Sequence, residues 1–122
     1  MNVFALARKS IESTYTGHCS IVEYKEVKDP VSKITKHEEV IVLENQPCRL
    51  SYDNISTTKS TESAHEVSQT IKLFIASEVE IKAGSKLVIN QNGTTKAYEC
   101  SGEPAIYPTH QEINLKLFKG WA

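Results

Sequence analysis

The chain has 122 residues, of which 39% are hydrophobic and 24% are charged, and its net charge is −1. This length predicts one domain with one core, and the composition excludes wholesale disorder. The near-neutral charge argues against nucleic acid as the main partner, and no apolar run approaches the ~20 residues of a membrane span. The start, MNVFALARKSIESTY, has neither an uninterrupted apolar stretch nor a cleavage site. We therefore expect folding in a cytoplasm, with no membrane as partner.

An amphipathic helix is predicted over residues 3–15. The apolar residues that recur at helical spacing on one face are Phe4, Ala7, Ile11 and Tyr15. Gly17 is a suitable stop for this helix. After it, apolar residues recur at every second position, which is the period of a strand.

Strands are then predicted along the rest of the chain. The segments with this alternation are 19–27, 34–43, 48–52 after Pro47, 67–75, 79–81, 87–90, 96–100, 105–107 and 112–118. The sequence KDPVSK predicts a turn between the first two, and Asn92-Gly93 is the strongest hairpin signal because both turn positions need positive φ. The residues expected in the core are Leu50, Ile71, Leu73, Leu87, Ile89, Ile113, Leu115 and Leu117.

These elements predict an all-β fold, a small β-barrel or sandwich of about seven or eight short strands with one N-terminal helix and a long polar loop. We expect a single domain over residues 1–122, with the barrel spanning residues 18–118.

The long polar loop covers residues 53–67. Between Asp53 and Glu66 its only large apolar side chain is Ile55, and it contains no Gly or Pro. Loops longer than ~12–15 residues are usually functional or disordered. Because this loop is too polar to pack on its own barrel, we interpret it as a projecting element that becomes ordered in an assembly. The alternative is a flexible spacer without a role.

No catalytic or metal-binding motif stands out. Cys19, Cys48 and Cys100 are odd in number and widely spaced, which fits neither a disulfide framework nor a zinc site, so we expect buried, reduced thiols. A nucleophile pair of Cys100 with His110 and a metal site at residues 37–39 (HEE) are weaker interpretations than core thiols and solvated strand charges. We therefore expect no enzyme, metal or cofactor.

The order of segments resembles a known family. After the helix come HCSIVEYKEVKDPVSKIT, ENQPCRLSY, the polar loop and SQTIKLFIASEVEIKAGSKLVI, and the most specific pieces are AGSKLVI (83–89), SGEPAIY (101–107) and HQEINLKLFKGWA (110–122). This arrangement resembles the head-completion or stopper proteins, which are head-tail connector proteins in the neck of long-tailed bacteriophages and of prophages of Gram-positive bacteria. The resemblance covers almost the whole chain.

The resemblance implies a structural virion protein without catalysis or cofactor. It would form a ring below the portal that closes the DNA channel and offers a surface for tail attachment. The implied partners are other copies of itself, the portal or adaptor protein and a tail-completion protein, with packaged DNA touched only indirectly. The implied location is the host cytoplasm during assembly and then the virion neck.

The resemblance also assigns residues to the assembly. Those that match the channel-closing loop are Asp53, Asn54, Ile55, Ser56, Thr57, Thr58, Lys59, Ser60, Thr61, Glu62, Ser63, Ala64, His65, Glu66 and Val67. The charges of this loop nearly balance, which favours plugging by strands or packed loops over binding of DNA phosphates. Possible interface anchors are Phe4, Ile11 and Trp121. Two roles stay open for Trp121, which either covers one end of the barrel or anchors a partner.

Two other functions stay open. One is a different neck or tail-completion protein, such as a tail terminator. The other is an OB-like barrel that binds nucleic acid, which would need aromatic side chains beside basic ones on an outward face. Such pairings occur only around Phe74, which has Lys72 nearby, and around Phe118, which has Lys116 and Lys119 nearby.

Overall fold

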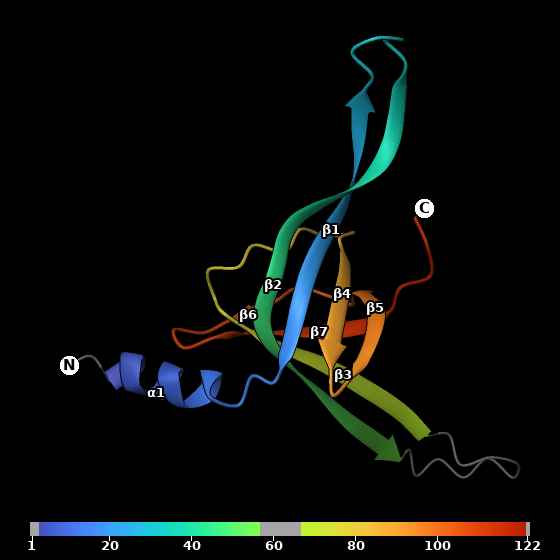
Figure 1. The fold of residues 1–122 in the computed structure, drawn as a ribbon. Helices are drawn as coiled ribbons and strands as arrows, with labels where there is room; N and C mark the ends of the chain where they lie inside the picture. Colours follow the sequence, from blue (N-terminus) through green and yellow to red (C-terminus); the bar gives the residue numbers. More distant parts are fainter. Residues whose placement is uncertain (1–2, 57–66, 122) are drawn as a thin grey trace, which may run out of the picture.

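The computed structural model describes residues 3–56 and 67–121, and most of these lie in β-strands (Figure 1). The elements are the helix α1 (Val3–Glu12) and the strands β1 (Gly17–Lys28), β2 (Thr35–Ser56), β3 (Val67–Ile75), β4 (Lys86–Gln91), β5 (Thr94–Cys100), β6 (Ala105–Ile106) and β7 (Gln111–Leu117). The all-β fold with one N-terminal helix, which the sequence predicts, is confirmed.

The strands form one antiparallel sheet that closes on itself. Their order is β3-β2-β1-β4-β5-β7-β6, and β3 also pairs with β7, from Ile71↔Leu115 to Ile75↔Gln111. Strand β7 therefore bonds to β3 along one edge and to β5 and β6 along the other. This closure leaves an interior that side chains fill, and the barrel core lies there.

The core confirms most of the predicted set. Seven of the eight expected residues are buried, and Cys19, Ile21, Cys48, Ile75 and Tyr98 join them. The prediction for Leu117 is wrong, because its side chain is 55% exposed. Strand β3 pairs with β7 only as far as Leu115, so Leu117 lies beyond the closed part of the barrel.

Strand β2 is one continuous strand, whereas the sequence predicts two separate strands at 34–43 and 48–52. Its first part pairs with β1 up to Cys48, and its second part pairs with β3 from Cys48 onward. Register shifts between Cys19 and Val22 place two extra residues in β2, and Asn45 adopts φ 50°. These bulges bend the strand and let it pass from one partner to the other. Pro47 therefore lies within a strand and not at its start.

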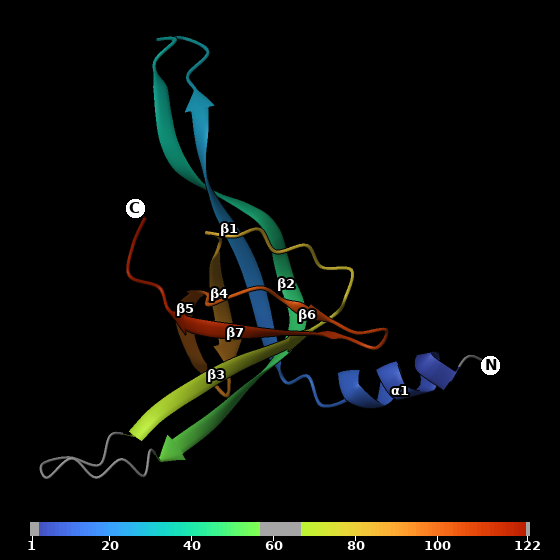
Figure 2. The ribbon, with the colours of Figure 1, turned by 180° about the vertical axis from the view of Figure 1, so that it is seen from behind.

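Two antiparallel arms project from the barrel (Figures 1 and 2). The first arm consists of residues 23–28 of β1 paired with residues 35–40 of β2, joined by the turn at 29–34. The second arm consists of residues 53–56 of β2 paired with residues 67–70 of β3. Among the described residues, the two strands of each arm pair only with each other, since the pairings with β4 and β7 end at Val22 and Ile71.

Three other local predictions are settled by the structure. The helix ends at Glu12, before the predicted residue 15. Residues 79–81 are not a strand. The buried Gln111 amide donates to the carbonyl oxygens of Ala76 (2.8 Å) and Val79 (2.6 Å), which holds this segment as a loop. The hairpin turn at Asn92-Gly93 is confirmed, with φ angles of 55° and 76°.

Candidate assembly surfaces

The second arm forms the base of the predicted channel-closing loop. The sequence places Asp53–Ser56 and Val67 in that loop, but the structure pairs them as strand, with Ser56 opposite Val67. The loop boundaries at 53 and 67 are therefore too wide, because the polar residues at both ends still form a regular antiparallel ladder. The remaining residues of the prediction, 57–66, lie outside the described residues.

The glutamine side chain at the end of β4 marks the point where β2 enters the second arm. Oε1 of Gln91 accepts a hydrogen bond from the Leu50 N–H at 2.8 Å, and Nε2 donates to the Leu50 carbonyl at 3.2 Å. The amide thus takes the place of β1, whose pairing with β2 ends at Gly17↔Cys48. A methyl group at Gly17 would meet Gln91 Oε1 at 3.0 Å, so the glycine leaves room for this contact.

The outer edge of β2 is open beyond Gln91. Because successive strand residues point their backbone groups to opposite sides, the groups of Tyr52, Asn54 and Ser56 point the same way as those of Leu50, away from β3. Within residues 3–56 and 67–121 no strand pairs with this edge. The second arm therefore offers backbone donors and acceptors for an added strand.

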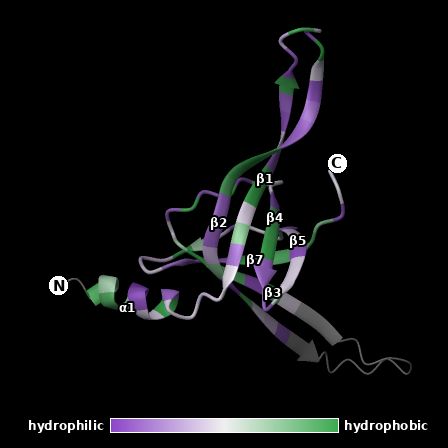
Figure 3. Cartoon of the chain, viewed as in Figure 1, coloured by the Kyte–Doolittle hydropathy of each residue, from purple (hydrophilic) through white to green (hydrophobic). Residues whose placement is uncertain are grey.

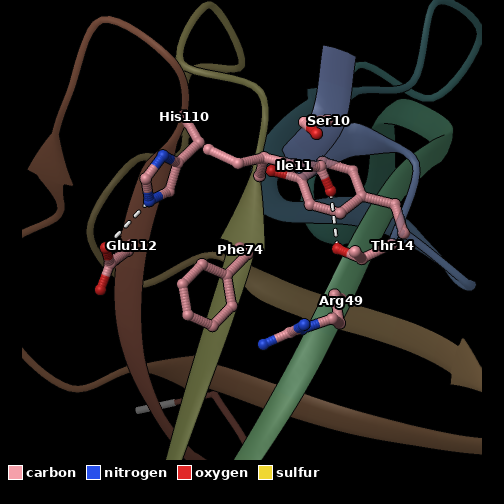
Figure 4. Close-up of a pocket in the computed structure, with 8 residues that line it drawn as sticks. Ser10, Ile11, Thr14, Arg49, Phe74, His110 and Glu112 are labelled. Atoms are coloured by element: carbon pink, nitrogen blue, oxygen red, sulfur yellow. Dashed lines mark hydrogen bonds and ion pairs between the residues drawn. The ribbon is translucent and has the colours of Figure 1, made fainter. Parts of the chain in front are cut away.

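A cleft of about 460 Å³ separates the end of α1 from the barrel wall (Figure 4). Its lining residues are Ser10, Ile11, Thr14, Tyr15, Arg49, Phe74, His110 and Glu112. The helix has no fully buried residue, and an ion pair of Arg8 with Glu78 attaches it to the barrel. Of the two predicted helix anchors, Ile11 lines this cleft, and Phe4 is 53% exposed.

The barrel side of this cleft is a network of paired groups. The His110 ring bonds to Thr109 Oγ1 at 2.8 Å and to Glu112 Oε2 at 2.9 Å, and it stacks on Tyr107. The hydrogen bond from His110, together with Lys72 at 3.3 Å, lowers the pKa of Glu112. His110 and Lys72 are thus both engaged with Glu112, while Arg49 lies over the Phe74 ring, 5.0 Å from its centroid.

The C-terminal segment lies against the base of the first arm. Trp121 stacks on Tyr24 with 5.0 Å between ring centroids and contacts Phe118 edge-on at 4.9 Å. Its Nε1–H donates to Glu39 Oε1 at 3.2 Å, and this bond is the main cause of the lowered pKa of Glu39. Lys86 also bonds to Glu39, at 3.1 Å. Trp121 therefore packs on its own chain and braces the first arm.

The first arm is a candidate assembly surface that the sequence reasoning missed, although it predicted a hairpin there. Its strands are mostly hydrophilic on both faces (Figure 3). Asp29 Oδ1 accepts from the Val31 N–H at 2.9 Å and organises the tip, where Val31 is 91% exposed. The signal in the sequence is the stretch from Tyr24 to Glu39, which lacks the one apolar face that a strand over a core requires.

The alternative chemical sites gain no support. Among the described residues, no group of three or more His, Cys, Asp or Glu side chains is placed to hold a metal. Cys19 and Cys48 are buried and unpaired, as predicted, and burial raises the pKa of Cys48 to about 12. The prediction of a buried thiol is wrong for Cys100, which is half-buried, although burial still raises its pKa.

Two of the three basic residues beside the predicted aromatic positions, Lys72 and Lys116, have acidic partners within the chain. Lys72 pairs with Glu112, and Lys116 lies 4.0 Å from Glu99. The Phe118 ring is covered by Lys86 and Trp121. At Phe74 an aromatic and basic pairing remains, because Arg49 lies over its ring, 5.0 Å from the centroid, in the cleft beside α1. In the described part of the chain no helix has the length and apolarity of a membrane span.

No protein-family model and no curated protein sequence matches the chain. Among solved structures, the chain is similar to protein xkdH of the phage-like element PBSX of Bacillus subtilis, with a TM-score of 0.50 and 12% sequence identity. The match covers 83% of this chain and 93% of that chain. At this identity the match shows a shared fold.

Proposed function

We propose that this chain is a structural protein of a phage or prophage virion that forms a ring at the neck, below the portal. In this proposal the ring closes the DNA channel after packaging and offers a surface for tail attachment. Its neighbours are other copies of the chain, the portal or an adaptor protein, and a tail-completion protein, while DNA is held back without specific phosphate contacts. Assembly takes place in the host cytoplasm.

The fold supports this proposal at the level of class. A barrel of the same fold occurs in a protein of a phage-like element. The described surfaces also suit a scaffold, because His110 and Lys72 beside the cleft at α1 are both engaged with Glu112. The order and motifs of the segments resemble the stopper family along almost the whole sequence.

The observation that carries the proposal is the second arm. Its strands stay in register to Ser56 and Val67, four residue pairs beyond the last contact of β3 with β7 at Ile71. A ribbon of this kind carries the paired ends Ser56 and Val67 beyond the closed part of the barrel. The open edge of β2 supplies the backbone groups by which neighbouring copies can pair.

The test is to replace residues 57–66 with Asn-Gly in a phage or prophage that depends on this protein. A two-residue turn of this type joins antiparallel strands directly, so the Ser56–Val67 pair and the barrel should persist. We expect particles that package DNA but lose it to nuclease or fail to join tails. The melting temperature of the purified variant shows whether the barrel remains folded.

A matched control lengthens a different hairpin. Inserting Ser-Gly at the Asn92-Gly93 turn changes a loop of β4 and β5 and leaves the second arm intact. This control should retain DNA and join tails. If the variant without residues 57–66 is folded and equally infectious, the channel-closing role is wrong.

A further inference from the structure

The first arm has two open strand edges. Residues 23–28 of β1 and 35–40 of β2 pair with each other, and in the described residues no other strand pairs with them. Their register is regular, because the two bulges of β2 lie closer to the barrel. Two-stranded ribbons are marginally stable in water, and natural edges are usually blunted by bulges, proline or charged side chains, of which this arm has charged side chains of both signs. The arm has its proline, Pro30, only in the tip turn.

The arm is also held in one orientation. Tyr24 lies between the His37 ring and the Trp121 ring, at centroid distances of 5.4 Å and 5.0 Å. Glu39, on the opposite strand, accepts a hydrogen bond from Trp121 and pairs with Lys86 of the barrel. Fixing the arm in advance lowers the entropy cost of a contact made by its edges.

We infer that the first arms of neighbouring copies pair edge to edge, with β1 of one copy beside β2 of the next. This inference rests on the proposed ring and identifies a contact that joins its subunits. In a ring all arms point the same way, so β1 of one arm runs antiparallel to β2 of the adjacent arm. The contact uses different surfaces on the two copies, as a ring with rotational symmetry requires.

The charges along the two edges select the register. Within one arm Lys25 lies opposite Glu38 and Glu26 lies opposite His37. If copies pair in the same register, Lys25 meets Glu38 of the next copy and Glu26 meets its His37. Each of these side chains then has a complementary residue on both sides, which stabilises cross-strand pairs.

Shifting the register between two copies by two residues would place like charges opposite each other. A shift of two residues in one direction brings Glu26 against Glu39 of the next copy. A shift in the other direction brings Lys25 against Lys36 and Glu23 against Glu38. A shift of one residue would fit the backbone donors and acceptors of the two edges only if the next arm were turned over, which a ring of copies in one orientation does not allow. The unshifted pairing is therefore the one that the side chains favour.

The test exchanges one charge pair. In the double variant Lys25→Glu with Glu38→Lys, the pair within each arm and the pair between two variant copies are both preserved with reversed sign. A contact between wild type and variant instead places Lys beside Lys or Glu beside Glu. We expect the double variant to self-associate like wild type, while mixed contacts are about threefold or more rarer than random mixing gives.

Native mass spectrometry of mixtures measures this directly. Because the exchange leaves the amino-acid composition and therefore the mass unchanged, wild type is labelled with heavy nitrogen so that the two proteins can be told apart. The control exchanges a cross-strand pair outside the arm, Glu99→Lys with Lys116→Glu, whose residues are opposite each other in β5 and β7. The control should mix at random with wild type.

Random mixing of the arm variant with wild type would overturn the inference, and so would the absence of self-association by wild type at its highest soluble concentration. Neither result depends on DNA retention. A protein that fails this test but loses DNA when residues 57–66 are removed would retain the proposed function and join its ring by other surfaces.

Discussion

The Gln91 side chain gives the sharpest test of how β2 leaves the barrel. It makes two hydrogen bonds to the backbone of the buried Leu50, at 2.8 Å and 3.2 Å, where β1 no longer pairs with β2. Gln91→Ala removes both partners and leaves the Leu50 N–H and C=O without bonds. At about 0.5–1.5 kcal/mol for each bond, the free energy of unfolding should fall by ~1–3 kcal/mol.

Thermal unfolding would show this loss as a melting temperature lower by roughly 4–12 °C for a domain of this size. Gln91→Glu should lose nearly as much, because a carboxylate accepts from the Leu50 N–H but cannot donate to its carbonyl. Amide exchange at Leu50 should become faster in both variants. These three results together separate loss of the bonds from a general loss of stability.

The matched control is the neighbouring residue on β4. In the described residues, the side chain of the exposed Asn90 makes one hydrogen bond, to the Thr95 hydroxyl at 2.7 Å. Its replacement by Ala should change the free energy of unfolding by less than about 0.5 kcal/mol. If Gln91→Ala and Asn90→Ala melt at the same temperature, the amide does not replace the missing strand and the reasoning is refuted.

The remaining predictions concern the core, one carboxylate and the thiols. Leu115→Ala should cost ~2–5 kcal/mol in thermal or urea unfolding, whereas Leu117→Ala, on the same strand, should cost less than about 1 kcal/mol; equal losses would contradict the core assignment. The pKa of Glu112 is lowered in the folded state, so its carboxylate stabilises the fold at pH values above its ordinary pKa of about 4.3. This stabilisation is lost as the pH falls through the folded-state pKa. Glu112→Gln should therefore weaken the acid dependence of unfolding. An unchanged acid limb would show that this carboxylate is not coupled to folding. Cys100 should react with a thiol reagent faster than the two fully buried cysteines of β1 and β2. If none of the three thiols reacts before the protein unfolds, the half-buried position of Cys100 is contradicted.

Local pattern predicts the barrel strands well. Strands β3 and β7 alternate apolar and polar residues, and the inward positions Ile71, Leu73, Ile113 and Leu115 are all buried as expected. A period of two assigns residues to faces without any knowledge of which strands are neighbours. The error at Leu117 has the same origin, since alternation does not tell where a strand passes the end of its partner.

Features that depend on contacts between residues far apart in sequence are harder to predict from the sequence. The break expected between residues 43 and 48 is absent because bulges and Asn45 carry β2 through a polar stretch. The stack of Trp121 on Tyr24 and the Gln91 bonds to Leu50 each join segments far apart in sequence. Nothing in the local pattern indicates such pairs. The sequence does mark the polar second arm, but it assigns the paired strand ends to the loop.

The two arms are linked by a single strand, and this constrains how the proposed ring works. Strand β2 belongs to the first arm up to Val40 and to the second arm from Asp53, with the buried Cys48 and Leu50 fixed in the core between them. Because the middle of the strand is held by the barrel, a contact at one arm cannot shift the register of the other without opening the core. The arms are therefore expected to act as independent attachments on one rigid block. Shortening the second arm should then leave the first-arm contacts intact, which is why DNA retention and self-association can be tested separately.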